Sequence, residues 1–442
     1  MKSCLAFTAV VFAAAFAPDA QATLKVRQIA TGADFACALT VERDIKCWGN
    51  NHVGQLGLGD TEVRGDEAGE MGDLLPFVDI DSASSTTAIE AGSTHACAIF
   101  GKGVLKCWGG NARGQLGLGD QRDRGKLSGD MGANLPAVDV APGHMVEQVA
   151  LGGEHTCARL DDGSVKCWGH NDHGQLGLGD EVDRGDDSGE MGTALPFVDL
   201  GPGRLARKIT AGLNHTCAIL DDGSVKCWGH NFTGQLGQGN SFDRGNTNFE
   251  MGNYLSAIDL GTGRTAVRID AGNDHTCAQL DDDSVKCWGA NDHGQLGLGD
   301  RSSRGDNGGE MGNPLPAVAT GVMLEPVSRV AAGSFHSCAI MGTILRCWGA
   351  NDTGQLGLGD DESRGDDPQE MGFWLPAIAI GTNRTPVQVE GGWQFTCLRY
   401  ANERVKCWGA NESGQLGYGN CDIVGLDPAD MGSALPFIDL GS

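Results

Sequence analysis

The sequence is short of aromatic residues, of basic residues and of long apolar runs. Phe, Trp and Tyr make up 6% of the 442 residues, and 32 Lys and Arg stand against 58 Asp and Glu, which gives a formal net charge of −26. A negative charge of this size opposes binding to nucleic acid and to anionic lipid surfaces. No stretch after residue 22 is apolar over the ~18 residues that a membrane-spanning helix requires. The sequence therefore predicts neither a nucleic-acid partner nor a membrane span.

The first 22 residues have the pattern of a signal peptide. They join Lys2 to an apolar run that ends near Ala17, and then to Ala20-Gln21-Ala22, which has the small-x-small form of a signal-peptidase site. Cleavage after Ala22 would leave residues 23–442 as the mature chain. The protein is therefore expected to be secreted, periplasmic or displayed at the cell surface.

Tryptophan recurs at a fixed spacing along the mature chain. Each tryptophan of the series is followed by the same tail, Asn-x-x-Gly-Gln-Leu-Gly, as at 171–177. The series is Trp48, Trp108, Trp168, Trp228, Trp288, Trp348 and Trp408, with 60 residues between neighbours. A constant period of this size predicts a repeat architecture, here with seven copies.

Two cysteines flank a predicted turn in each repeat. In the third copy the turn is the Asp-Asp-Gly at 161–163, a hairpin loop closed by a glycine in the left-handed region. This loop pairs Leu160 with Ser164 and places Cys157 opposite Cys167. Directly opposed residues of an antiparallel pair approach closely enough to form a disulfide.

The sixth repeat tests this interpretation, because Cys338 and Cys347 are nine residues apart instead of ten. A two-residue loop at Gly342-Thr343, of the type with glycine first, again places the two cysteines opposite each other. Export to an oxidising compartment would permit the bonds. Reduced core cysteines and zinc ligands are the competing interpretations, although zinc sites usually gather cysteines as close pairs at one place.

The predicted bridges leave Cys4 in the signal peptide and Cys421 without an evident partner, so we expect a free thiol at Cys421. The predicted pairs are Cys37 and Cys47, Cys97 and Cys107, Cys157 and Cys167, Cys217 and Cys227, Cys277 and Cys287, Cys338 and Cys347, and Cys397 and Cys407.

Each repeat contains four candidate strands. They are a first strand such as 267–271, the two cysteine strands, and a last strand such as 195–200. The many glycines, 70 in all, favour short strands and tight turns over helices. Four short strands per repeat are typical of one propeller blade, and seven blades close a ring that protects the strand edges. The predicted fold is an all-β, seven-bladed β-propeller with four-stranded blades at 23–442.

The repeat, written G-x-x-H-T-C-A-x-L-x-x-G-x-V-K-C-W-G-x-N-x-x-G-Q-L-G, resembles that of the regulator of chromosome condensation family. The resemblance covers the whole mature chain and implies a seven-bladed propeller. It implies function less firmly, because members include a nuclear guanine-nucleotide exchange factor, a plant ultraviolet photoreceptor and a secreted beta-lactamase inhibitor. The photoreceptor repeats Gly-Trp-Arg-His-Thr at its dimer surface, and this chain has one partial match, at 392–396, without the Arg and His.

Histidines and carboxylates recur, but as parts of the repeat. A histidine precedes the first cysteine by two residues in five copies, where we expect a structural, hydrogen-bonded side chain rather than a metal ligand. These are His95, His155, His215, His275 and His336. The acidic loops, such as 180–192, place an Arg between carboxylates, which favours local ion pairs over calcium, although calcium stays open. No catalytic set or phosphate loop stands out, so no enzyme activity, cofactor or metal is predicted.

Function is expected where the copies differ. In the turn between the first and second strands, the position four residues before the first cysteine is large and apolar at Leu213 and Trp393, and Phe335 lies in the same turn of the sixth copy. Exposed aromatic side chains of this kind anchor protein interfaces. We predict partner binding by Leu213, Phe335 and Trp393; packing in the core is the alternative.

The sequence as a whole indicates an exported, non-enzymatic propeller that binds a protein or another macromolecule. A secreted enzyme inhibitor is the first alternative. A guanine-nucleotide exchange factor is the second, but the constant period leaves no room for an element that protrudes from one blade, and export would separate the chain from intracellular GTPases.

Overall fold

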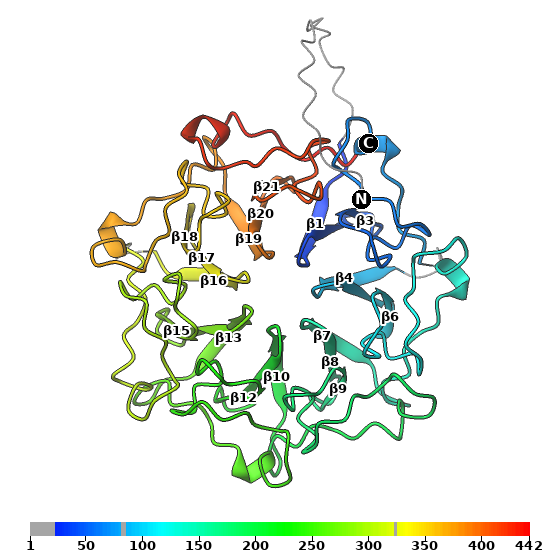
Figure 1. Cartoon of the computed structure of the whole chain (residues 1–442), viewed down its shortest axis with the longest axis vertical. Coiled ribbons are helices and arrows are strands. Elements are labelled where there is room, and N and C mark those ends of the chain that lie inside the picture. Colours follow the sequence, from blue (N-terminus) through cyan, green and yellow to red (C-terminus); the bar gives the residue numbers. More distant parts are fainter. Residues whose placement is uncertain (1–22, 81–84, 322–324) are drawn as a thin grey trace, which may run out of the picture.

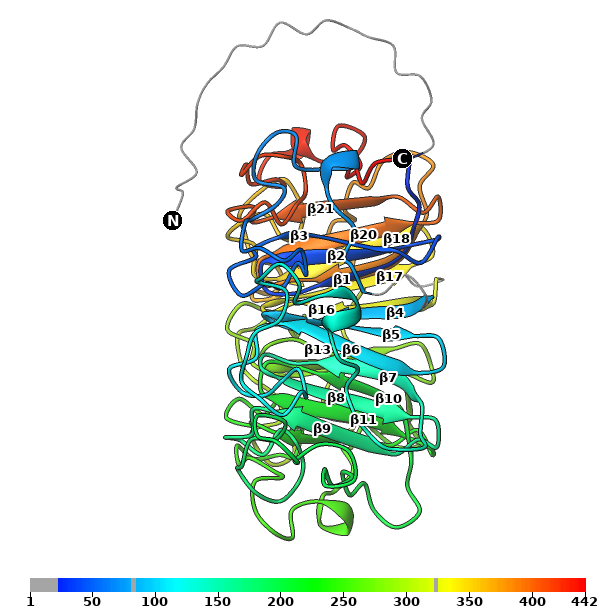
Figure 2. The same cartoon turned by 90° about the vertical axis from the view of Figure 1, so that its right-hand side faces the viewer.

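The computed structural model describes residues 23–80, 85–321 and 325–442, which close into a ring of seven blades (Figure 1). Each blade is an antiparallel sheet formed by one repeat, and blades are numbered 1 to 7 in chain order. Figure 2 shows the strands crossing the ring from one face to the other. The predicted signal peptide, 1–22, lies outside the described residues. None of the short 3-10 helices among the described residues could cross a membrane.

The first strand of each blade lines the axis, the second lies in the middle and the third lies outermost. The innermost strands are β1 Val26–Thr31, β4 Thr86–Ala91, β7 Val146–Leu151, β10 Ala206–Ala211, β13 Ala266–Ala271, β16 Val327–Ala332 and β19 Pro386–Gly391. The middle strands are β2 Phe35–Thr40, β5 His95–Phe100, β8 His155–Leu160, β11 His215–Leu220, β14 His275–Leu280, β17 His336–Met341 and β20 Phe395–Tyr400. The outer strands are β3 Ile45–Gly49, β6 Val104–Gly109, β9 Val165–Gly169, β12 Val225–Gly229, β15 Val285–Gly289, β18 Ile344–Gly349 and β21 Val405–Gly409. The 3-10 helices are η1 Gly72–Leu74, η2 Gly132–Asn134, η3 Gly252–Tyr254, η4 Gly372–Trp374 and η5 Pro428–Asp430.

The prediction of a fourth strand is wrong, since each described sheet has three strands. The segment 195–200 makes one backbone hydrogen bond to its own blade, from Val198 N to Val165 O at 2.8 Å. Pro196 has no N–H to donate, and Leu200 O is taken by the ammonium of Lys226 in the next blade at 3.0 Å. The segment therefore bridges two blades instead of extending one sheet.

The cysteine hairpins form as predicted. Leu160 N donates to Ser164 O at 2.9 Å and Cys157 lies opposite Cys167. In blade 6 the turn at Gly342-Thr343 pairs Met341 with Ile344, and Cys338 again faces Cys347. All seven predicted disulfides are present, with Cα atoms 4.0–4.1 Å apart.

Cys421 is disulfide-bonded, so the expectation of a free thiol at this position is wrong. Its Sγ lies 3.7 Å from the carbonyl oxygen of Asp66, which belongs to the neighbouring blade 1. The repeat pattern pairs cysteines only within a blade, and Cys421 stands outside that pattern. Sequence periodicity therefore carries no information about its partner.

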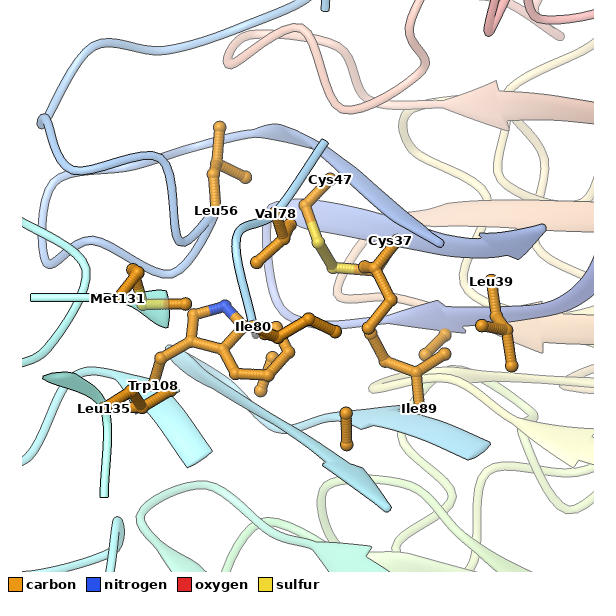
Figure 3. Close-up of a cluster of buried hydrophobic side chains, with 14 of the residues drawn as sticks. Cys37, Leu39, Cys47, Leu56, Val78, Ile80, Ile89, Trp108, Met131 and Leu135 are labelled. Atoms are coloured by element: carbon orange, nitrogen blue, oxygen red, sulfur yellow. A yellow bond between two sulfur atoms is a disulfide. The ribbon is translucent and has the colours of Figure 1, made fainter. Parts of the chain in front are cut away.

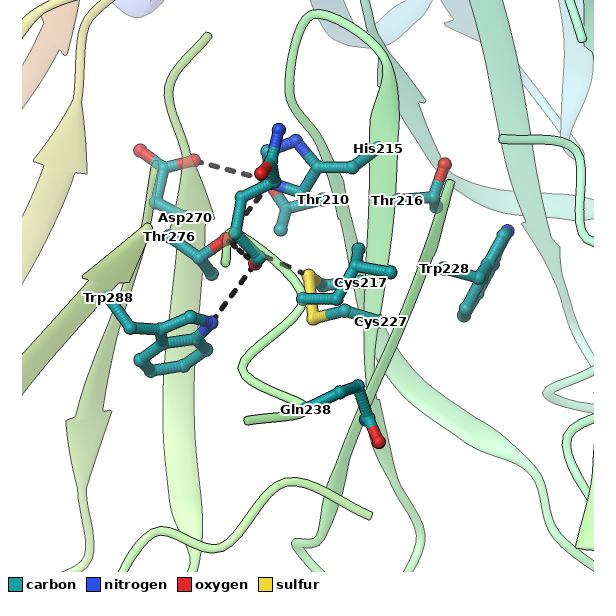
Figure 4. The surroundings of a disulfide bond; sticks show 12 residues. Thr210, His215, Thr216, Cys217, Cys227, Trp228, Gln238, Asp270, Thr276 and Trp288 are labelled. Atoms are coloured by element: carbon teal, nitrogen blue, oxygen red, sulfur yellow. Dashed lines mark hydrogen bonds between the residues drawn. A yellow bond between two sulfur atoms is a disulfide. The ribbon is translucent and has the colours of Figure 1, made fainter. Parts of the chain in front are cut away.

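Hydrogen bonds from the repeated residues join each blade to the next, and we call this set the interblade belt. Trp288 Nε1 donates to Gln235 O at 3.0 Å, and Thr276 Oγ1 donates to the same carbonyl (Figure 4). His215 Nε2 lies 2.9 Å from Thr276 Oγ1, whose proton is already given to Gln235, so the imidazole is the donor. The same contacts recur around the ring, and Trp48 Nε1 closes it on Gln415 O of blade 7 at 3.0 Å.

The belt histidines are fully buried, as expected for structural side chains. Burial lowers the pKa of His95, His155 and His275 to about 3 and that of His215 and His336 to about 4. All five imidazoles are therefore neutral at physiological pH. Each one holds two blades together by a hydrogen bond to a Thr or Ser hydroxyl.

The hydrophobic core lies between blades, where the tryptophan of one blade meets the disulfide face of its neighbour. Figure 3 shows Trp108 of blade 2 in one cluster with Cys37, Cys47 and Leu56 of blade 1. The tail turn must approach this indole closely: Gly57 has φ +68°, and a Cβ there would lie 2.9 Å from Trp108 Nε1. The tail therefore requires glycine at this position.

The acidic loops are held by local ion pairs, as the recurrent Arg predicted. Arg184 Nη2 lies 2.7 Å from Asp180 Oδ2, and Gly185 N donates to Glu190 Oε2 at 2.8 Å. In blade 7, where Val424 replaces the Arg, the backbone bridge to Gly409 is kept at 2.7 Å. The ion pair is thus lost there, but the position of the loop against the outer strand is not.

Candidate binding site at the central channel

Seven turns, between the first and second strand of each blade, surround one end of the channel; we call them the rim. They are residues 32–34, 92–94, 152–154, 212–214, 272–274, 333–335 and 392–394. Backbone hydrogen bonds of 2.9–3.3 Å join each turn to the next. The ring closes from Trp393 N to Ala33 O at 3.1 Å. The mouth of the channel is therefore a rigid backbone ring, and its chemistry depends on the side chains that project from it.

A cavity of about 780 Å³ opens behind the rim. The innermost strands β1, β4, β7, β10, β13, β16 and β19 line it. A cavity of this volume can hold a drug-sized ligand or a few side chains of a partner. Its walls vary from blade to blade, unlike the interblade belt.

Three cations line one side of the cavity, on adjacent blades 4, 5 and 6. Lys208, Arg268 and Arg329 occupy the third position of β10, β13 and β16. Within the described chain, none of the three side chains forms an ion pair or a hydrogen bond with a carboxylate. Burial, followed by repulsion from the neighbouring guanidinium groups, lowers the pKa of Lys208 and of Arg268. The site thus gathers positive charge on one side of a cavity that carboxyl groups also line, and Arg329 favours the ionised form of three of these carboxyl groups.

Three carboxyl groups face the same cavity from the fifth position of β4, β13 and β19. Glu90 accepts a hydrogen bond from Gln28 Nε2 at 3.2 Å, and Glu390 accepts one from Gln388 Nε2 at 2.9 Å. Asp270 accepts from Thr210 Oγ1 at 3.2 Å, which is visible in Figure 4.

The same three carboxyl groups hold protons more tightly than carboxyl groups in water. Burial raises the pKa of Asp270 to about 6. Burial, followed by the charge of Asp270, raises the pKa of Glu390 to about 7. The pKa of Glu90 is raised well above its usual range by burial and by Glu390. Around neutral pH part of the acidic charge is therefore neutralised, which leaves the three cations less balanced.

The rim residues predicted to bind a partner lie on one face but do not form a single patch. Trp393 is 45% exposed and lines the mouth of the cavity. Leu213 of blade 4 also lines the mouth, three blades away from Trp393, and its side chain lies close to Gly153 of blade 3. Phe335 is half-buried and packs edge-on against His293, with ring centroids 5.6 Å apart. Their role in binding stays a prediction.

Sequence reasoning missed a second set of exposed aromatic residues away from the rim. Most belong to blade 4, and two lie in helix η4 after blade 6. They are Phe232, Phe242, Phe249 and Tyr254, and Phe373 and Trp374, with exposed fractions of 67–78%. The signal was present in the sequence, because the third copy has Asp172, Val182, Gly189 and Ala194 at the positions of the first four.

Comparison with known proteins identifies the repeat. Two models of the regulator of chromosome condensation (RCC1) repeat match most of the chain. One matches residues 26–55, 87–115, 146–175, 206–235, 266–295 and 387–415, and the other matches residues 47–99, 102–159, 162–219, 282–340 and 347–398. The chain belongs to the RCC1 repeat family. The resemblance inferred from the sequence is thereby confirmed.

Several relatives of this RCC1-repeat propeller are known. The ultraviolet-B receptor UVR8 of Arabidopsis thaliana is 28% identical over 89% of this chain and 79% of its own. The secretion-regulating guanine nucleotide exchange factor of Bos taurus is 27% identical over 84% of this chain and 75% of its own. Prp20p of Saccharomyces cerevisiae, whose structure was described with its binding to Gsp1p and histones, superposes with a TM-score of 0.61 at 22% identity. That alignment covers 83% of this chain and 80% of Prp20p, and shows the shared fold.

Proposed function

We propose that this RCC1-repeat propeller is an exported scaffold that binds another protein through the rim and the channel behind it, without chemistry of its own. The observation that carries the proposal is the combination of an exposed Trp393 at the mouth with Lys208, Arg268 and Arg329 inside. An aromatic anchor beside half-buried cations fits a protein segment that carries a carboxylate. Export rests on the signal-peptide pattern of residues 1–22.

The fixed backbone ring supports this mode of binding. A preorganised surface loses little conformational entropy on association, so more of the contact energy appears as affinity. The charge of the cavity would add specificity, since an acidic segment is repelled by most of the surface of a protein with net charge −26 and attracted at the channel.

Affinity capture from the native extracellular fraction, followed by mass spectrometry, tests the proposal. Three baits are compared: the parent, Trp393→Ala, and Trp374→Ala as an exposed aromatic control outside the rim. We expect one protein to be retained by the parent and by Trp374→Ala and to be lost with Trp393→Ala. If the protein is retained by Trp393→Ala and lost with Trp374→Ala, the binding face lies at the perimeter of the ring and the proposal is refuted.

Guanine-nucleotide exchange is a second candidate, favoured by the sequence similarity to the bovine exchange factor. It requires contact with an intracellular GTPase, whereas the amino-terminal pattern predicts export. The measurement that distinguishes the two is release of labelled GDP from a panel of small GTPases. Release of GDP at catalytic amounts of the propeller would favour the exchange function. An unchanged rate of release would favour the proposal of an exported protein-binding scaffold. If the captured partner is an extracellular hydrolase, the scaffold is an inhibitor, and the activity of that hydrolase will fall when the propeller is added.

A further inference from the structure

Two histidines and an aspartate meet in the tail loops where blade 3 contacts blade 4. His173 Nδ1 lies 2.9 Å from Asp243 Oδ2, and the rings of His173 and His230 are 4.4 Å apart between centroids. One ligand-capable atom from each of the three residues lies within 4.8 Å of the other two. All three side chains are half-buried, so that water can reach them. None of the three belongs to the interblade belt.

The carboxylate is held in place from behind. Asp243 Oδ1 accepts a hydrogen bond from Asn231 N at 2.8 Å, which leaves Oδ2 directed at His173. On His230, Nδ1 lies 2.9 Å from Gln235 Nε2 and 3.5 Å from Asp274 Oδ1. The other imidazole nitrogen, Nε2, offers its lone pair to a metal in the tautomer that keeps the proton on Nδ1, beside Asp274 Oδ1. A carboxylate behind a histidine ligand is a usual outer partner in metal sites, because it orients the ring and strengthens it as a donor.

The other six junctions of the ring lack this combination. At the junction of blades 2 and 3 the same places hold Arg113, His170 and Asp183, and Arg113 Nη1 lies 3.4 Å from Asp183 Oδ2. There the aspartate oxygen is paired with a permanent cation. At the junction of blades 5 and 6, His293 stands alone, with Ala350 and Ser363 at the other two places.

We propose that His173, His230 and Asp243 form a site for a divalent transition-metal ion, with Zn²⁺ as the ion that fits this ligand set. Two imidazoles and one carboxylate suit zinc, and the exposed side leaves the fourth position to water. Around a tetrahedral zinc with bonds of ~2.0–2.1 Å the ligand atoms lie about 3.3 Å apart, so small side-chain rotations suffice to close the group. The bound ion takes the place that the Arg113 guanidinium holds at the junction of blades 2 and 3.

The experiment is titration of the mature protein, purified without a histidine tag and stripped with chelator, with ZnCl₂ in a calorimeter and with CoCl₂ in a visible spectrometer. We expect one tight site per chain and the absorption of four-coordinate Co²⁺. His173→Ala and His230→Ala should each weaken Zn²⁺ binding at least tenfold, while His293→Ala, the matched histidine with Ala350 and Ser363 at the other two positions, should leave it unchanged.

A gain of binding gives an independent check. Arg113→His should create a second site with His170 and Asp183 and raise the stoichiometry from one to two. The absence of a Zn²⁺ site in the parent, or an equal loss of affinity with His293→Ala, would overturn the proposal. Because circular dichroism of each variant reports folding separately, loss of binding in a folded His173→Ala protein cannot be mistaken for unfolding.

Discussion

The interblade belt and the central channel are built from neighbouring strands of the same blades, yet they follow opposite rules. In the belt an indole donates to a glutamine carbonyl at all seven junctions, and a hydroxyl bond to that carbonyl and a neutral buried imidazole recur at five of them. In the channel the third and fifth positions of the innermost strands differ in charge from blade to blade. Lys208, Arg268 and Arg329 gather on one side, and carboxyl groups hold protons nearly to neutral pH.

The difference separates two kinds of constraint. The repeated residues satisfy a requirement that is identical at seven junctions, namely to bury apolar surface and pair backbone groups between blades. The channel has no such requirement, because its side chains face a cavity. Gathering partly buried charges of like sign costs stability, so the three cations on one side of the channel are what the proposed binding role would explain.

The strongest test of this contrast removes one member of the belt. Trp228 is fully buried and donates to Gln175 O at 3.0 Å. Trp228→Ala should lower the free energy of unfolding by about 3–5 kcal/mol, the range for large aromatic truncations in cores. Chemical denaturation measures it, with the half-exposed Trp393→Ala as the matched control. A loss below about 1 kcal/mol would mean that the belt does not hold the ring together.

Removal of one disulfide should have the next largest effect. The double substitution Cys217→Ala and Cys227→Ala removes a cross-link that restricts the unfolded chain. In the loop-entropy model this loss should lower the free energy of unfolding by about 2–3 kcal/mol at most. Denaturant midpoints of the two proteins give the difference. An unchanged midpoint would indicate that the hairpin is held without the bond, while partner binding at the rim should be unaffected in either case.

The third test moves to the channel mouth. Trp393→Ala should cost the captured partner at least ~2 kcal/mol of binding, or roughly thirtyfold in affinity, if the indole is a buried anchor in the complex. Its melting temperature should stay near that of the parent, because the side chain is 45% exposed in the free protein. Titration calorimetry and a thermal melt are both needed. A lower melting temperature with unchanged affinity would show that Trp393 packs the ring and binds nothing.

The smallest effect concerns pH. The pKa of Glu390 is raised from 4.5 to about 7 in the folded protein. The stability that this side chain contributes is therefore fully present below pH 4.5 and is lost as the pH rises through 7. Glu390→Gln should therefore be more stable than the parent at pH 8, relative to the difference between the two proteins at pH 4. Exposed Glu62→Gln serves as control and should show no such trend. A difference that is independent of pH would mean that the pKa of Glu390 is the same in the folded and the unfolded protein.

The belt histidines give stability the opposite dependence on pH, so that the folded state becomes less stable as the pH falls. These histidines stay neutral in the folded state and gain protons on unfolding. Their folded pKa values of about 3 to 4 lie below the unfolded value of 6.5. Acidification below pH 6.5 therefore favours the unfolded chain. Comparing each variant with its parent at the same pH cancels this common term.

Much of the fold follows from the sequence because each repeat is a local unit. Hairpin loops fix the register over a few residues, so the opposition of the cysteines in all seven pairs, including Cys338 and Cys347, could be derived from loop lengths. The prediction that they are bonded also used the expected export to an oxidising compartment. The predicted fourth strand is absent because the backbone of 195–200 forms hydrogen bonds both to its own blade and to the next one. The pattern of residues in one repeat does not show that a second blade competes for these backbone groups.

The candidate site was less accessible to sequence reasoning. Glu90, Asp270 and Glu390 are spread over 300 residues and meet only because the ring brings every innermost strand to one axis. The convergence of His173 with Asp243 likewise needs the contact between adjacent tails. The signal in the sequence was a residue that differs from its counterparts in the other copies. This comparison identified Trp393, but it was not made for the innermost strands or for the tails.

The way the ring closes has a consequence for the order of its parts. No blade borrows a strand from the opposite end of the chain: β1, β2 and β3 are consecutive, and so are β19, β20 and β21. The two ends of the described chain meet where Leu24 N donates to Gly441 O at 2.7 Å. A circular permutant that joins Ser442 to Leu24 and opens the chain between two other blades would keep the seven sheets and the seven intrablade disulfides intact. The propeller therefore has no structurally privileged first blade, and the order of its seven units along the gene is one of seven equivalent choices for the same ring.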